Sequence, residues 1–138
     1  MKDLKNDIAV TNAFNTQVIN TDTVTNGNII DLKDYEGCTF IISAGVVTAG
    51  SVLPILKESD VITFGGEETA VSDVDLIGTE LLCTLDASHE VKTLGYKGSK
   101  RYVRLSLDSD ASANLTAGAS CVRSHGLVKK DITNLAGG

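Results

Sequence analysis

Apolar and polar residues alternate along much of this chain, in short runs separated by residues that favour turns. The alternation is clearest in 100–108, where Val103, Leu105 and Leu107 are separated by polar residues. Successive side chains of a strand point to opposite faces, so this spacing predicts a strand with one buried face. The segment 39–44 is nearly all apolar, which is typical of a strand covered on both faces.

Turn residues divide the rest of the chain into further candidate strands. The dipeptide Asn26-Gly27 predicts a hairpin turn, because both residues accept positive φ. Pro54 cannot donate a ladder hydrogen bond, which predicts a sheet edge or a bulge at that position. The acidic segment 67–75 is predicted to be a long loop. The remaining strands are predicted at 17–24, 28–32, 51–58, 61–64, 80–85, 90–96 and 117–123.

The spacing of these segments predicts an all-β fold, namely an antiparallel β-sandwich or small barrel of jelly-roll or immunoglobulin-like type. About eight to ten short strands fit the turn signals, and no segment shows a convincing helical pattern. We predict one sandwich domain at 17–125. It is flanked by an N-terminal arm, 1–16, and a C-terminal arm, 126–138.

Composition and charge limit the classes of partner that we expect this protein to bind. The formal net charge is -6 and the isoelectric point is about 4.7. Nucleic-acid backbones are bound by basic surfaces, so this charge argues against nucleic acid as a partner. The sequence contains no apolar run of roughly 20 residues, the length that a membrane-spanning helix needs. No apolar run of signal-peptide length follows the N-terminus, so we expect synthesis in the cytoplasm and no membrane partner.

Residues that carry chemistry are few. The two histidines, His89 and His125, both lie in turn-like contexts, so we predict no enzymatic activity. Aspartates at 73–75 and 108–110 lack the rest of a calcium loop, and we expect neither a metal nor a cofactor. The three cysteines have no CxxC spacing and are predicted to be buried free thiols, with Cys83 on one strand face with Leu81 and Leu85.

The glycine-broken segment 95–100 is the most basic part of the chain. It lacks the spacing of a phosphate loop and leads into a strand, so we predict a hairpin turn with a basic tip. The tip either pairs with acidic residues of a partner or is a solvated charged face. The two tyrosines beside it are either interface anchors or caps of the core. The candidate interface residues here are Tyr96, Lys97, Lys100, Arg101, Tyr102 and Arg104.

The N-terminal arm supplies two further candidate interface residues, Ile8 and Val10. An unpaired extended segment can add as a strand to the edge of a neighbouring sheet, where backbone hydrogen bonds provide affinity. This hypothesis predicts that removal of 1–16 weakens association and leaves the fold intact.

Three stretches of the chain together resemble a family of virion proteins. They are TFIISAG at 39–45, AGSVLPILKESD at 49–60 and LGYKGSKRYVRL at 94–105. This order resembles the small virion proteins of tailed bacteriophages, which accompany the major capsid protein and are interpreted as head decoration or cement proteins. The resemblance covers roughly 39–123 and contains no catalytic signature.

The resemblance implies a structural protein on the capsid surface of a virion, bound to the outer face of major capsid protein subunits. Because such proteins sit at symmetry axes, we expect self-association, as a homotrimer first and a dimer second. A tail-tube or head–tail connector subunit is an alternative with the same chemistry. A glycan-binding sandwich is another, although the chain has no Trp to form a sugar platform.

Overall fold

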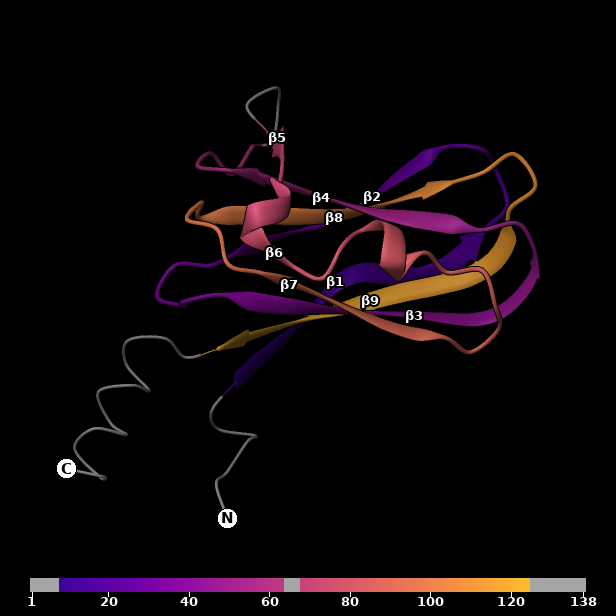
Figure 1. The fold of residues 1–138 in the computed structure, drawn as a ribbon, viewed down its shortest axis with the longest axis horizontal. Helices are drawn as coiled ribbons and strands as arrows, with labels where there is room; N and C mark the ends of the chain where they lie inside the picture. Colours follow the sequence, from indigo (N-terminus) through magenta and orange to yellow (C-terminus); the bar gives the residue numbers. More distant parts are fainter. Residues whose placement is uncertain (1–7, 64–67, 125–138) are drawn as a thin grey trace, which may run out of the picture.

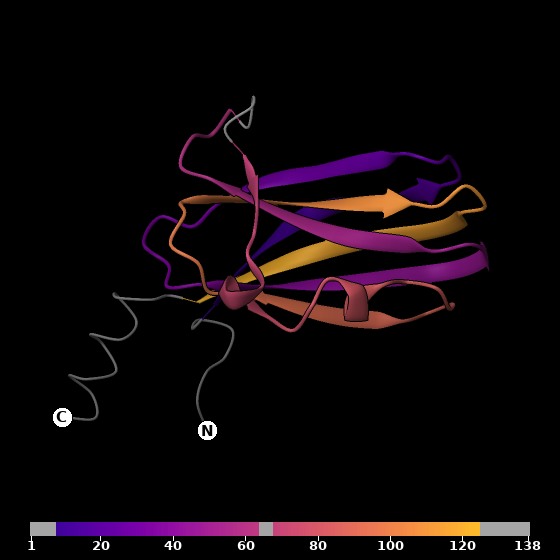
Figure 2. The same cartoon turned by 45° about the horizontal axis from the view of Figure 1, so that its top comes forward.

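Two antiparallel sheets pack face to face as a β-sandwich (Figures 1 and 2). The computed structural model describes residues 8–63 and 68–124. No α-helix is present in this described part, which contains only two short 3₁₀ helices, η1 (Asp73–Asp75) and η2 (Leu81–Cys83). The predicted all-β antiparallel fold is confirmed, and of the two predicted architectures, sandwich and small barrel, the structure is a sandwich.

The larger sheet has five strands in the order β1-β9-β3-β7-β6. Its three long strands, β1, β9 and β3, lie side by side, and β7 follows them. The two-residue strand β6 forms the edge beside β7. The bounds are β1 Ile8–Ile19, β9 Asn114–Ser124, β3 Cys38–Ala49, β7 Val91–Tyr96 and β6 Leu76–Ile77.

The smaller sheet has four strands in the order β2-β8-β4-β5. Its bounds are β2 Val24–Asp31, β8 Tyr102–Ser109, β4 Val52–Ser59 and β5 Thr69–Ala70. The connections between consecutive strands often cross from one sheet to the other, so neighbours in space are mostly distant in sequence.

The core lies between the two sheets and follows the alternation of the sequence. Val103, Leu105 and Leu107 of β8 are all fully buried, as their spacing predicts. From the opposite sheet, Phe14 and Phe40 are also fully buried and fill the same layer. All three cysteines are buried and free, which confirms that prediction.

The N-terminal segment is where the predicted boundaries fail most clearly. Residues 8–16 are not an arm: they belong to β1, which pairs with β9 from Ile8 opposite Ser124 to Ile19 opposite Leu115. Phe14 of this strand has no exposed surface. Removal of 1–16 would therefore take away part of the core, contrary to our prediction. The rest of the N-terminal arm, 1–7, and the whole C-terminal arm, 126–138, lie outside the described residues.

Asn26-Gly27 does not form a hairpin turn. It lies inside β2, at a register shift between Asn26 and Ile29, and the turn from β1 to β2 is at 20–23. A Cβ atom on Gly27 would collide with the carbonyl oxygens of Ala13 and Leu105. The glycine is therefore required for close approach of the backbones rather than for a tight turn.

Two other predicted strands are also absent. The segment 80–85 forms η2 and one isolated bridge instead, from Leu85 to Val52. Cys83 and Leu85 are buried as predicted, but Leu81 and Leu82 are exposed, so Leu81 does not share the face of Cys83. Residues 61–63 form a bend and a turn, and residue 64 lies outside the described part. The predicted acidic loop 67–75 contains the short β5 and η1 in its described portion.

Pro54 lies at a sheet edge, as predicted. Its strand β4 pairs with β8 along its whole length and with β5 only at Lys57 and Glu58. Farther along this edge, the Glu80 carboxylate accepts a hydrogen bond from the Leu56 amide at 2.7 Å. Burial raises the pKa of Glu80. The side chain thus takes the place of a strand and limits access to this edge.

Candidate interaction surfaces

The predicted basic tip joins the two sheets and is not a hairpin. Its segment 97–101 runs from β7 of the five-stranded sheet to β8 of the four-stranded sheet, at the left of Figure 1. The connection 32–37 lies at the same end, where the Leu32 amide donates to the Arg101 carbonyl at 2.7 Å. This end of the sandwich therefore brings together two segments that are far apart in sequence.

Tyr96 caps the core at this end, whereas Tyr102 lies on the outward face of β8, on the same side as Arg104. Both are buried, with 2% and 8% of their surface exposed. The Tyr96 hydroxyl donates to Glu58 Oε2 at 2.6 Å and accepts from the Lys100 amide at 3.1 Å. Burial and the neighbouring carboxylate raise the pKa of Tyr96, so the phenol keeps its proton and serves as a donor. Of the two predicted roles, capping describes Tyr96, and the role of Tyr102 stays a prediction.

Gly98 fits the connection tightly over Tyr96. An added Cβ atom would lie 2.6 Å from Tyr96 Cζ. The glycine therefore allows the loop to settle on the ring edge, where the hydroxyl can reach the Lys100 amide. The buried hydrogen bonds and this close approach fix the path of the connection between the sheets.

Lys100 and Arg101 are engaged within the chain. Lys100 Nζ lies 2.9 Å from Asp60 Oδ2, and Arg101 holds both carboxylate oxygens of Asp31 at 3.0 Å. The hydrogen bonds from Arg101 lower the pKa of Asp31. The Arg101 guanidinium also lies 4.9 Å from the centroid of the Tyr102 ring. Both pairs are exposed to solvent, so they are weak and can exchange with groups on a partner.

The other candidate cations lie on different sides of the molecule. Lys97 is exposed, and its amide donates to the Asp75 carbonyl at 2.8 Å. Arg104 is the third residue of β8, opposite Ile29 of β2 and Lys57 of β4, on the outward face of the four-stranded sheet. The structure therefore places Lys97, Lys100 and Arg101 in one connection and Arg104 on the adjoining sheet face.

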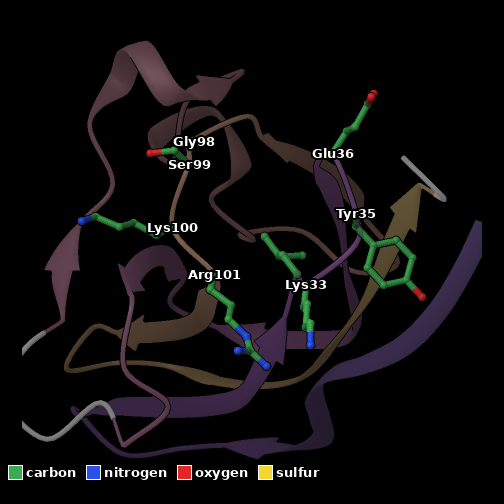
Figure 3. A pocket seen from close by; sticks show the side chains of 8 residues that line it. Lys33, Tyr35, Glu36, Gly98, Ser99, Lys100 and Arg101 are labelled. Carbon is green, nitrogen blue, oxygen red and sulfur yellow. The ribbon is translucent and has the colours of Figure 1, made fainter. Parts of the chain in front are cut away.

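A hollow of about 410 Å³ opens between the two connections at this end. Figure 3 shows that its side chains diverge: Lys100 points away from Arg101 and Lys33, and Glu36 points away from all three. A small-molecule site needs polar groups that converge on one ligand. The geometry is therefore that of an open, mixed-charge surface. The lining residues are Leu32, Lys33, Tyr35, Glu36, Gly98, Ser99, Lys100 and Arg101.

The opposite end has a different charge. Its connections are 20–23, 50–51, 86–90 and 110–113, which join the far ends of the strands. They contain four carboxylates, on Asp22, Asp86, Glu90 and Asp110, and neither lysine nor arginine. The end that carries Lys33, Lys97, Lys100 and Arg101, which we call the basic end, also holds Asp34, Glu36, Asp60 and Asp75, so its surface is of mixed charge. The connections at the opposite end carry carboxylates without lysine or arginine.

The outward face of the five-stranded sheet carries no charge, and we call it the uncharged face. The registers place its residues in rows; one row runs Val10, Val122, Thr39, Gly95 and Ile77 across all five strands. The whole face consists of valine, isoleucine, threonine, serine, asparagine and glycine. Its members are Ile8, Val10, Asn12, Val18, Thr39, Ile41, Ser43, Ile77, Val91, Thr93, Gly95, Thr116, Gly118, Ser120, Val122 and Ser124.

The predicted interface residues Ile8 and Val10 belong to this face. They are already paired with β9 of their own chain, opposite Ser124 and Val122. Strand donation by these residues to a neighbouring sheet is therefore not the arrangement in the structure. Their side chains nevertheless contribute to the uncharged face, and Val10 is 61% exposed.

Sequence reasoning missed the other apolar members of this face. Ile77, Val91 and Ile41 are exposed by 63%, 62% and 36%. The available signal was the period of two in 39–43 and 91–95, where one set of alternate positions holds threonine, serine, isoleucine and valine. That signal predicts a strand, but it does not indicate which of two apolar faces lies outward.

Catalytic groups do not converge in the described part of the chain. His89 lies in a turn with φ 62, and its amide donates to the Gly45 carbonyl. Within residues 8–63 and 68–124, no three side chains of His, Cys, Asp or Glu form a cluster that could bind a metal ion. The helices of this same part are too short to cross a membrane.

Comparisons with known proteins add no family. Scanning the chain against protein-family models gave no match, and searching the curated proteins gave none either. Inferences about function therefore rest on the residues, on the surfaces described above and on the resemblance of the three quoted stretches.

Proposed function

We propose that this protein is a virion structural protein that decorates a phage capsid by binding the outer surface of major capsid protein subunits. The resemblance of 39–60 and 94–105 to phage decoration proteins supports this function. The observation that carries it is the gathering of exposed cations at one end of a chain whose net charge is -6. Lys33, Lys97, Lys100 and Arg101 lie there among carboxylates and can pair with acidic groups of a partner.

The proposed mechanism is association without chemistry. The basic end meets acidic residues on the shell, and complementary charge orients the protein and speeds its encounter. Lys100 and Arg101 can exchange Asp60 and Asp31 for carboxylates of the capsid, because both pairs are exposed. A protein that binds only the assembled shell stabilises it by mass action.

The test is cosedimentation of the full chain with assembled capsids that lack it. The wild-type protein is expected to bind saturably with a fixed stoichiometry. Absence of binding would overturn the proposal. Formation of rings or tubes by the protein alone would also overturn it and would indicate a tail role.

Charge reversal at Lys97 tests the proposed surface. Lys97 is preferable to Lys100 or Arg101, because reversal of those residues also breaks their pairs with Asp60 and Asp31. Lys97→Glu is expected to slow association about threefold to tenfold at low salt, and less at high salt. Lys92→Glu on β7 changes the net charge equally outside the basic end and serves as the control. Equal effects of the two variants would contradict the assignment.

A further inference from the structure

The uncharged face is large enough to be an interface. Its strands lie about 4.8 Å apart and rise about 3.4 Å per residue, so each residue covers about 16 Å² of the sheet. The five strands have 12, 11, 12, 6 and 2 residues, which gives a footprint of roughly 700 Å². A stable interface buries about 800 Å² of accessible surface on each partner. A pleated surface has more accessible area than its flat footprint, so the face reaches this size.

Its composition is that of the centre of an interface. Charged residues are depleted at interface cores, where apolar side chains dominate. The exposed Val10, Ile41, Ile77 and Val91 are interspersed with threonine and serine, whose hydroxyls can pair with one another across a contact. Charged residues make up 22% of the chain, so a sheet face that has none differs clearly from the rest of the surface.

We infer that the uncharged face binds the same face of a second copy of this chain. Two molecules of net charge -6 repel one another over most of their surfaces. Electrostatic repulsion between two copies is weakest where the uncharged faces approach each other. In a two-fold symmetric dimer each copy uses the same surface, and a face without charge meets no like charge on the same face of its partner. Two sheets of identical twist can then pack about 10 Å apart with a mutual rotation of about 30°.

The outward face of the four-stranded sheet does not fit this role. It presents Asp31, Lys57, Arg104 and Asp108, of which Lys57 and Arg104 lie directly opposite each other. Burial of such residues against the same residues of a second copy would desolvate these charges and bring like charges together, which costs free energy. Self-association is therefore assigned to the five-stranded sheet alone. The dimer contact is additional to the proposed contact with the capsid, and it uses a different surface from the basic end.

The experiment compares two matched isoleucines by sedimentation equilibrium of the full chain. Ile41 lies mid-strand on the uncharged face between Ser120 and Thr93, and Ile55 lies mid-strand on the outward face of the other sheet opposite Ser106. The wild type is expected at twice the chain mass of 14.5 kDa. Ile41→Lys brings two cations together across the two-fold axis and should weaken self-association at least about tenfold. Ile55→Lys should leave it unchanged.

Thr93→Lys provides a second variant, because this residue is exposed and its replacement does not disturb the core. It should weaken self-association in the same direction, with an unchanged circular dichroism spectrum and melting temperature. A monomeric wild type at about 100 µM would overturn the inference. Dimers that persist in both Ile41→Lys and Thr93→Lys, or a trimer insensitive to them, would also overturn it. Capsid cosedimentation distinguishes the failure of this inference from the failure of the proposed function. If the wild type forms dimers that Thr93→Lys weakens, but neither protein binds capsids, only the proposed function fails.

Discussion

The two sheets of the sandwich bury similar inner faces but present different outer ones. The five-stranded sheet shows only uncharged residues, with Ile41 and Thr93 near its middle. The four-stranded sheet shows Asp31, Lys57, Arg104 and Asp108 in its registers. Folding requires only the inner faces, so a difference between the outer faces reflects what each meets in solution. A charged face is suited to water, whereas an uncharged one is suited to another protein.

The largest predicted effect separates the two faces of a single strand, β1. Phe14 points into the core with no exposed surface, whereas Val10 points outward and is 61% exposed. Phe14→Ala should lower the free energy of unfolding by about 3–5 kcal/mol, because it leaves a large cavity. Val10→Ala should cost less than about 1 kcal/mol. Urea denaturation of the monomer measures both. Equal losses would show that β1 does not divide a core from a surface.

The next prediction concerns the connection between the two sheets. Tyr96→Phe removes the hydroxyl that donates to Glu58 and accepts from the Lys100 amide, and leaves both groups without this partner. We expect a loss of about 1–3 kcal/mol in the free energy of unfolding. Tyr102→Phe is the control, because Tyr102 is also buried but its ring lies on the outward face of β8 beside Arg101. If both variants lose the same amount in thermal denaturation, the hydrogen bonds of Tyr96 contribute nothing specific.

The smallest effect is expected on the charged face. Asp31→Asn breaks the pair with Arg101, and because the pair is exposed, the loss should stay below about 1 kcal/mol. Arg101 lowers the pKa of Asp31, so the pair stabilises the fold above the ordinary aspartate pKa of about 4. This contribution disappears as the pH falls through the lowered pKa of the folded state.

Stability curves of wild type and Asp31→Asn between pH 2 and about 7 test this sign. The two curves should converge at acid pH and separate above about pH 4. Curves that separate only at acid pH would contradict the assignment.

The sequence allowed the architecture to be predicted where burial is periodic. In β8 the alternation of Val103, Leu105 and Leu107 alone identified the strand and its inner face. The failures came from tertiary contacts that no local pattern encodes. Asn26-Gly27 has the chemistry of a turn, but the carbonyls of Ala13 and Leu105 need the space beside its glycine. Leu81 and Leu82 suggest a buried strand, yet η2 leaves both exposed.

The candidate surfaces were predicted only in part. The sequence grouped Lys97, Lys100 and Arg101 correctly, because they are neighbours along the chain. It could not show that Asp60 and Asp31 engage two of them, since those carboxylates come from other connections. The uncharged face was invisible for the same reason, because its residues come from five strands and become a surface only when the registers align them.

The central claim is that the two outer faces differ in what covers them, and thiol labelling tests it most directly. Ile41→Cys and Ile55→Cys each place one accessible thiol in a chain whose own three cysteines are buried. The proteins would first be reduced, and maleimide labelling after removal of the reductant would be followed at increasing protein concentration. We predict that the Ile41→Cys thiol becomes progressively protected while the Ile55→Cys thiol reacts at a constant rate. Constant rates for both thiols, or protection of Ile55→Cys alone, would contradict the account.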